Sequence, residues 1–412
     1  MLSNNTRIGI IGAGAAGLSA ALALRKKGYK NITLLEKEVY AGGKCHSFDY
    51  QGRNFELGAV VIPYCSRKTL NIISDLGLKV APLTKDRAFF NSSGEQIELI
   101  GKLEQIQFFW QVFVKLPYLQ FKYRKIFQPG FKNINDELIQ SFEGFCKQNN
   151  LDLFEKFSNS VCAAYGYGYF DQVSTAYYLK FLKLPLVLAV ITQTDFIFLE
   201  GSANVWKKIA EQFDVRYQQH INNIKRNETI EVETQTEVLE LDKLILACPL
   251  DNALNFLDTA LDEEELFSKI KYNKYWSFAL IMENMPKKSI GYLPSNFSPD
   301  KQGHIMCWYR RYPDINLYNF YVIANNSQEE QDIEKIMIED LNQIGATIKE
   351  KYVSAEWKYF PHVDILDIEN KFYERLESLQ GMNNTYFVGE LLNFSYIEAV
   401  IEYSYDLVKR FF

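Results

Sequence analysis

The chain has 412 residues, more than a single hydrophobic core usually supports, so we expect two or three domains. Its net charge of -6 argues against nucleic acid as the main partner, because phosphate binding needs a clustered basic surface. Six scattered cysteines without a CxxC pair indicate reduced thiols and a cytoplasmic protein, and four scattered histidines predict no metal site.

The N-terminal stretch RIGIIGAGAAGLSAALALRKKGYKNITLLE, residues 7–36, predicts a strand, a glycine turn, a helix, a second strand and a closing acid. Gly12 permits the tight turn, Gly14 lets the backbone approach a pyrophosphate, and Gly17 lets the helix pack closely on the strand. Around Ala16 the helix N-terminus would face the phosphates. Glu36 stands where a carboxylate accepts hydrogen bonds from a ribose and disfavours NADP, so we predict a dinucleotide site.

A second glycine-rich stretch follows, GGKCHSFDYQGRNFELGA, from Gly42 to Ala59. It contains paired glycines, a lysine, a short hairpin and a later Gly-Ala pair. Taken by its residues alone, it predicts a glycine-rich hairpin.

Residues 105–135 contain no acidic residue, while five basic residues alternate with nine aromatic ones. This pattern fits peripheral contact with a membrane surface. It fits a solvated basic face on a core helix equally well, because Phe109, Trp110 and Phe113 repeat at helical spacing. We expect Pro117 and Pro129 to break the segment into short helices. With a mostly helical stretch after it, we interpret residues 88–199 as a helical cap.

Strand patterns dominate the rest of the chain. YQQHINNIKR, TIEVETQ and KLILACP predict three strands between residues 216 and 249, and WSFALIME, HIMCWY and NFYVIAN predict a sheet within residues 271–374. Near the end, residues 385–388 predict a strand, and a helix is expected from Ile397 onward. We therefore expect a discontinuous nucleotide domain built from residues 1–87, 200–270 and 375–412.

These motifs resemble a large group of flavoproteins that includes amine oxidases and phytoene desaturases. The resemblance implies an α/β fold with a Rossmann-like FAD-binding domain, a helical cap and a mixed-sheet substrate domain. It also implies which residues contact FAD. Gly42, Gly43 and Lys44 run beside the pyrophosphate, and Gly58, Ala59 and Val60 lie against the flavin ring. Ile221 meets the adenine through its backbone, and the C-terminal contacts come from Gly389, Glu390, Ile397, Glu398 and Val400.

A narrower resemblance comes from GGKCHSFDYQGRNFELGA, AAYGYGYFDQVSTAYYLKFL, YFPHVD and the last forty residues, which are similar to bacterial FAD-dependent polyunsaturated fatty acid double-bond isomerases that make conjugated linoleic acid. The resemblance implies a free fatty acid substrate such as linoleate. Non-covalent FAD takes a hydride from its bis-allylic carbon and returns it to the same molecule, so no electron-transfer partner is required.

In that family Arg87 corresponds to the residue that binds the substrate carboxylate, and Tyr165 to a pocket-lining aromatic. No catalytic side chain is implied, because the cofactor carries the chemistry. Residue type alone gives Arg87 another role, that of a surface arginine paired with Asp86 or Glu95.

Two other functions remain open from the sequence. One is a net FAD-dependent oxidoreductase of the amine oxidase or carotenoid desaturase kind. Amine oxidases usually carry a glycine just before the last helix, however, and this chain has Tyr396-Ile397-Glu398 there. The other is a flavin-stabilised lipid-binding protein without turnover.

Overall fold

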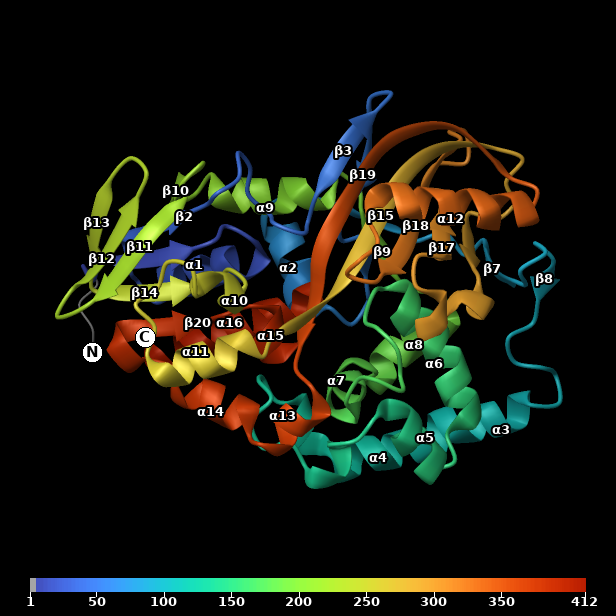
Figure 1. Cartoon of the computed structure of the whole chain (residues 1–412), viewed down its shortest axis with the longest axis horizontal. Coiled ribbons are helices and arrows are strands. Elements are labelled where there is room, and N and C mark those ends of the chain that lie inside the picture. Colours follow the sequence, from blue (N-terminus) through green and yellow to red (C-terminus); the bar gives the residue numbers. More distant parts are fainter. Residues whose placement is uncertain (1–4) are drawn as a thin grey trace.

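The structure is a computed structural model that describes residues 5–412, so the first four residues of the predicted segment 1–87 lie outside it. At one end of the molecule is a five-stranded parallel sheet in the order β10-β2-β1-β14-β20 (Figure 1). Its strands are β1 (Ile8–Ile11), β2 (Ile32–Leu35), β10 (Asp214–Arg216), β14 (Lys243–Leu246) and β20 (Thr385–Phe387). Three stretches that lie far apart in the sequence therefore share one sheet.

Two long helices lie together beside this sheet. They are α1 (Ala15–Lys26) and α16 (Ile397–Phe411), and the Ser404 hydroxyl donates to the Ala16 carbonyl at 3.1 Å. An antiparallel sheet of β11 (Ile221–Arg226), β12 (Ile230–Thr234) and β13 (Val238–Leu241) extends from the same end.

The three strands predicted between residues 216 and 249 divide between two sheets, and KLILACP belongs to the parallel one. Its strand β14 lies between β1 and β20 in the parallel sheet, and β13 supplies the third antiparallel strand. The burial of the strands explains the difference. All four residues of β14 are buried, as expected for a strand covered on both faces, whereas β12 alternates between buried and exposed residues.

The other end of the molecule is built on a seven-stranded mixed sheet in the order β19-β15-β18-β17-β16-β7-β8. Its strands are β7 (Arg87–Phe90), β8 (Gln96–Ile97), β15 (Lys271–Glu283), β16 (Ile290–Tyr292), β17 (Ile305–Tyr309), β18 (Leu317–Ala324) and β19 (Thr347–His362). Helix α12 (Glu330–Gln343) packs on one face, over a core that includes Phe278, Phe320 and Met337.

The expected helical cap over residues 88–199 needs correction at both of its ends. Strands β7 and β8 belong to the seven-stranded sheet, because β7 pairs with β16 in parallel register. Strand β9 (Phe196–Phe198) pairs with β5 (Val61–Ile62) and β6 (Val80–Pro82) in a small separate sheet. Only the residues between these strands form helices.

These helices form the lower right of Figure 1. They are α3 (Gln105–Trp110), a π-helical turn (Gln111–Lys115), α4 (Leu116–Lys122), α5 (Phe142–Gln148), α6 (Asp152–Ala164), α7 (Thr175–Phe181) and α8 (Leu184–Thr192). Pro117 does not break the helix as predicted. The π-turn directly before it changes the hydrogen-bond register where the proline lacks an N–H, so the helix continues through residues 105–122.

The remaining regular elements are short connections. The strands are β3 (Ser47–Tyr50) and β4 (Arg53–Glu56), and the helices are α2 (Arg67–Asp75), α9 (Ser202–Ala210), α10 (Leu250–Ala253), α11 (Leu261–Ser268), α13 (Ile365–Glu369), α14 (Phe372–Ser378) and α15 (Glu390–Asn393). Within residues 5–412 no single helix has the length and apolarity to cross a bilayer, although α7 and α8, bent by 63° at their junction, pass that test as a pair.

Candidate active site

A cavity of about 1200 Å³ lies between the parallel sheet, α16 and the seven-stranded sheet. Pockets for a single small ligand typically measure about 300–1,000 Å³, so this one has room for two ligands in contact. Its wall combines glycine-rich turns at one end with aromatic side chains at the other. The two ends differ in what they can bind.

The glycine end has the shape of a dinucleotide cradle. Gly12 has a φ of +105°, and an added Cβ on Gly17 would lie 2.0 Å from the Gly12 carbonyl oxygen, so helix α1 packs directly on the turn. At Gly14 the nearest atom to an added Cβ is the Gly43 Cα, at 3.9 Å, which leaves space open toward the cavity. Gly12, Gly14, Gly42 and Gly43 line the cavity, whereas Gly17 does not and has only the packing role.

Two helix N-termini point their free N–H groups at this cavity. Helix α1 follows Gly14 with no side-chain cap and no acid in its first turn, and Ala16 lines the wall. Helix α16 begins after Tyr396, also without a side-chain cap, and Ile397 and Val400 line the wall. Phosphate oxygens and the electron-rich edge of a flavin ring are suitable ligands for such termini.

Glu398 was predicted to contact the cofactor, but its carboxylate faces another helix. It accepts hydrogen bonds from the Lys68 N–H at 2.9 Å, the Thr69 N–H at 2.8 Å and the Thr69 hydroxyl at 2.8 Å. Glu398 therefore holds α2 against the start of α16, because its charge satisfies the free N–H groups of α2. Glu398 is nevertheless one of the residues that line the cavity.

Glu36 is buried at the end of β2 and lines the cavity. Its two oxygens accept hydrogen bonds from the Ala13 N–H at 2.7 Å and the Glu38 N–H at 3.0 Å. Since a carboxylate has about four lone-pair positions, both oxygens can still accept from ribose hydroxyls. The hydrogen bond from Ala13 therefore fixes Glu36 against the glycine turn.

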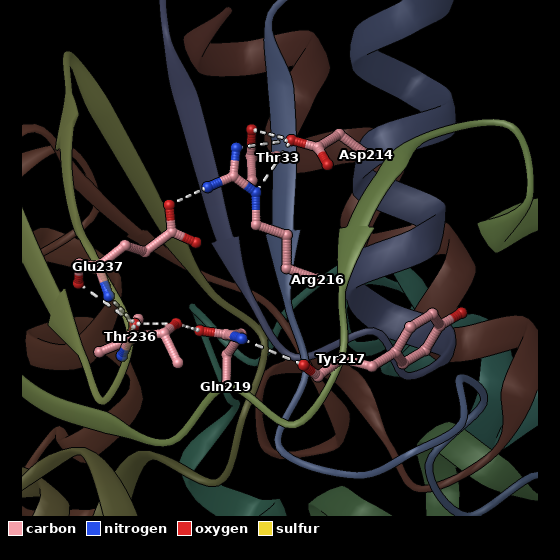
Figure 2. A network of polar contacts seen from close by, with 8 residues as sticks. Thr33, Asp214, Arg216, Tyr217, Gln219, Thr236 and Glu237 are labelled. Atoms are coloured by element: carbon pink, nitrogen blue, oxygen red, sulfur yellow. Dashed lines mark hydrogen bonds and ion pairs between the residues drawn. The ribbon is translucent and has the colours of Figure 1, made fainter.

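Beyond Glu36, a polar network fixes the loop that carries Gln219 (Figure 2). Arg216 binds Asp214 at 3.1 Å and also pairs with Glu237, which ties β10 to the turn between β12 and β13. The Thr236 hydroxyl donates to the Gln219 side chain at 3.0 Å. Gln219 and Ile221 line the cavity, so this network places the predicted adenine contact.

Lys44 and Glu390, both predicted to contact the cofactor, bind each other in the cavity wall. The Lys44 ammonium lies 2.8 Å and 3.0 Å from the two carboxylate oxygens, and it also lies 5.4 Å from the centre of the Tyr359 ring. The Ser395 hydroxyl donates to the same carboxylate at 3.1 Å. The pair joins the second glycine stretch to the segment after Gly389. Gly389 has a φ of +142°, and an added Cβ there would meet no atom within 4 Å.

Residues Gly58, Ala59 and Val60 line the cavity as well. A Cβ on Gly58 would lie 1.8 Å from the Lys44 carbonyl oxygen, so only glycine allows this close approach of the two backbones. The Ser277 hydroxyl donates to the Leu57 carbonyl at 2.6 Å, and this bond secures the segment to the seven-stranded sheet.

The aromatic end of the cavity was largely missed by the sequence analysis. Its side chains come from the face of the seven-stranded sheet opposite to α12 and from the end of α6. They are Tyr165, Tyr167, Tyr275, Tyr292, Tyr309, Tyr321, Trp357 and Tyr359. The available signal was alternation within strands, because residues two apart, such as Trp357 and Tyr359, share a face.

Arg87 lies beyond this aromatic end and is not itself part of the wall. It pairs with Ile290 in the β7–β16 register, so it shares a sheet face with Ile290 and Tyr292, which do line the cavity. The interpretation as a surface ion pair is wrong. Asp86 binds Lys288 and Ser289, and Glu95 binds Asn91.

The Arg87 guanidinium has no hydrogen-bond partner for its buried Nε and Nη2 atoms in the part of the chain that the structure describes. The charge of Arg87 acts on Asp195, whose buried Oδ1 has no hydrogen-bond partner among the described residues either. Burial raises the pKa of Asp195 to about 6, while the positive charge of Arg87 opposes the increase. Buried polar atoms without partners are uncommon in folded proteins, so Arg87 and Asp195 are candidates for contact with a bound polar group.

Comparison with known proteins agrees with this architecture. The profile of the flavin-containing amine oxidoreductase family matches residues 15–402, and the chain belongs to that family. A crystal structure of a CLA-producing fatty acid isomerase from P. acnes matches with a TM-score of 0.96 and 29% identity over 100% of both chains. Beta-cyclopiazonate dehydrogenase of Aspergillus oryzae is 23% identical over 92% of this chain and 87% of its own length.

A structure of putrescine oxidase bound to putrescine matches with a TM-score of 0.75 at 15% identity over 98% of both chains, which shows a shared fold alone. The predicted fold class and the resemblance to the fatty acid isomerases are confirmed, and the cofactor is FAD. The glycine cradle and the two uncapped helix N-termini fit this cofactor. Among the described residues, no cluster of His, Cys, Asp and Glu side chains forms a metal site.

Proposed function

We propose that this flavoprotein isomerises polyunsaturated fatty acids by moving one double bond into conjugation without net oxidation. The observation that carries the proposal is the half-buried Arg87, whose buried Nε and Nη2 atoms have no partner within residues 5–412, beside an aromatic chamber continuous with the glycine cradle. The similarity to the CLA-producing fatty acid isomerase supports it. FAD, when bound, supplies a ring that can accept a hydride from a bis-allylic methylene and return it to the same substrate.

The residues of the chain supply position and environment. Arg87 offers two N–H donors in the geometry that a carboxylate accepts, which fixes the head of the fatty acid. The aromatic faces of the chamber stabilise positive charge that develops on a pentadiene system. Burial raises the pKa of Tyr165, Tyr275 and Tyr321 well above the usual value, so these phenols stay neutral and act as apolar walls and weak dipoles.

The test is incubation of the purified holoprotein with linoleate under argon, without NADH or an added electron acceptor. We expect conjugated-diene absorbance to rise over many turnovers. Deuterium placed on the bis-allylic carbon should be recovered in the product. An absolute requirement for oxygen or a quinone would show net oxidation, and loss of the label to water would show proton transfer; either result rejects the proposal. Binding of linoleate without any product would indicate a lipid-binding protein instead.

A further inference from the structure

The helix that runs through residues 105–122 carries a second apolar surface that the fold leaves uncovered. We call it the outer face. It consists of Leu103, Ile106, Phe109, Trp110, Phe113, Val114, Tyr118 and Phe121. Leu103 is 98% exposed, Ile106 is 84% exposed and Phe121 is 69% exposed. Of the eighteen exposed large hydrophobic residues in the described part of the chain, these eight lie within nineteen consecutive positions, and the others are scattered.

The opposite side of the same helix is already packed into the protein. Phe108, Val112, Leu116, Leu119 and Tyr123 are buried. A helix that is apolar on all sides belongs inside a protein or in contact with lipid, because water covers neither face favourably. A contiguous exposed apolar patch of this kind marks an interaction site.

Basic residues predominate around the outer face. Lys102 precedes it, and Arg124, Lys125 and Lys132 follow it. All four are exposed, and none forms an ion pair within residues 5–412. The nearest carboxylates are engaged elsewhere, since Glu104 accepts from the Gly101 N–H at 2.8 Å and Glu137 binds Lys122 and Tyr123. The local surface is positive in a chain of net charge -6.

The apolar outer face and the basic residues around it together indicate which kind of partner binds there. A second copy of the chain would bring two sets of unpaired basic side chains together, and an isologous interface must be complementary to itself. An anionic bilayer offers apolar chains to the outer face and negative head groups to its basic ends. Aromatic and basic side chains at the edge of a lipid layer are the usual anchors of proteins that lie on a membrane.

Hydrogen bonds and ring packing connect the helix of the outer face to α6, which extends to the cavity. Gln111 donates to the Asp152 carboxylate at 2.7 Å, and its side-chain oxygen accepts from the Phe154 N–H at 2.8 Å at the start of α6. The rings of Phe108 and Phe157 lie 5.2 Å apart. Helix α6 then runs about 20 Å to Ala164, which lines the cavity beside Tyr165. Figure 1 shows α3 and α4 along the outer edge of the helical group, away from the parallel sheet.

We propose that the outer face docks this protein on the surface of an anionic membrane, with Lys102, Arg124, Lys125 and Lys132 contacting the head groups. The protein lies on the bilayer without spanning it. The docked helix places the start of α6 near the phase in which fatty acids concentrate, and the other end of α6 reaches the aromatic end of the cavity. This proposal rests on the exposed residues of the outer face and does not depend on the reaction in the cavity.

The test is co-flotation of the holoprotein with vesicles of phosphatidylcholine, alone or mixed with phosphatidylglycerol. We expect binding to the anionic vesicles, weakened at about 0.5 M NaCl because salt screens the head-group charges. Replacing Ile106→Ser and Trp110→Ser together should reduce the partition coefficient at least about tenfold, since two large apolar side chains lose their lipid contact. Arg124→Glu with Lys125→Glu should abolish the preference for anionic lipid.

The matched control is Leu261→Ser with Leu366→Ser, which removes two equally exposed apolar side chains from other surfaces and should leave binding unchanged. Bound-FAD absorbance and thermal unfolding, unchanged in each variant, show that the fold is intact. Equal vesicle binding by the wild type and the Ile106/Trp110 variant would overturn the proposal. So would a dimer in gel filtration that dissociates in that variant, because the outer face would then join two copies of the chain.

Discussion

Arg87 is the residue whose surroundings most need a ligand. Its Nε and Nη2 atoms are buried without a partner, although a buried unpaired donor costs about 1–3 kcal/mol and a charged one more. A charge-assisted bidentate contact with a carboxylate would satisfy both atoms. We therefore predict that Arg87→Ala weakens binding of free fatty acids roughly thirty- to a hundredfold, corresponding to about 2–3 kcal/mol, with unchanged FAD content.

Fatty acid methyl esters are the control for this prediction, because they lack the negative charge. Titration calorimetry with the acid and with its ester, on the wild type and on the variant, separates the contribution of the carboxylate charge from that of the rest of the ligand. If Arg87→Ala weakens both ligands equally, the arginine supports the shape of the cavity and does not bind the carboxylate.

Asp195 makes the same site dependent on pH. Burial raises the pKa of Asp195 to about 6, and Tyr165, Tyr292 and Cys65 are the other titratable groups that sense its charge. Burial raises the pKa of all three above the ordinary values of phenols and thiols, so Asp195 is the one that titrates near neutrality. Below pH 6 its carboxyl is neutral, and above pH 6 its negative charge competes with the substrate for Arg87.

Affinity for the free acid should therefore fall as the pH rises through about 6, and the fall should be smaller for the methyl ester. Asp195→Asn keeps the shape of the side chain without its ionisation, so its affinity should be flat through that range. A wild type whose affinity stays level between pH 5 and about 8 while the acid remains ionised would contradict this role.

At the scale of single elements, α1 distinguishes packing from cofactor binding. A Cβ on Gly17 would collide with the Gly12 carbonyl, whereas a Cβ on Gly14 would meet no atom closer than 3.9 Å, and the Gly14 φ of -77° suits any residue. We predict that Gly14→Ala leaves the apoprotein as stable as the wild type but weakens FAD binding, because the methyl group occupies the approach of the phosphates.

Gly17→Ala should destabilise the apoprotein as well, since the helix must move away from the turn. Urea unfolding of the two apoproteins and FAD titration of each measure the difference. Equal loss of stability in both variants would mean that the two glycines share a packing role.

The elements themselves were predictable to the extent that local pattern determines them. Strands β1 and β2, helix α1, and the C-terminal strand and helix are encoded in contiguous residues, and the structure confirms them. The predicted boundary between residues 87 and 88 cuts strand β7, because its four residues, RAFF, do not show which sheet they join, and only the pairing with β16, about two hundred residues later, does. Pro117 was judged by its propensity, and the π-turn that accommodates it is a tertiary adjustment.

For the molecule as a whole, the site could be predicted where one motif carries it and not where several strands meet. All the predicted cofactor residues except Gly17 line one cavity, although they come from segments as distant as Gly12 and Val400. Apart from Tyr165, the tyrosines of the aromatic chamber escaped prediction because the strand order of the seven-stranded sheet decides which of them meet. That order is a property of the packed molecule and is not written in any single strand.

The same arrangement predicts that FAD stabilises the entire molecule. FAD at the glycine end would contact the parallel sheet, α16 and the segment of residues 58–60, and the Ser277 bond to Leu57 ties that segment to the seven-stranded sheet, so the bound cofactor links both ends of the molecule. The unfolded chain brings none of these segments together and should not bind FAD. At a free FAD concentration a hundred times the Kd, the folded state gains about 2.7 kcal/mol.

Thermal unfolding of the apoprotein should therefore shift upward with the logarithm of FAD concentration, and circular dichroism and tryptophan fluorescence should report one shared shift. Trp206 lies near the glycine turns and Trp308 lies in the seven-stranded sheet, so fluorescence samples both ends. The unfolding temperature of the Gly14→Ala apoprotein should rise only at much higher FAD concentrations. If FAD protects one end while the other unfolds at its original temperature, the cofactor does not bridge the two sheets, and the cavity is divided in solution.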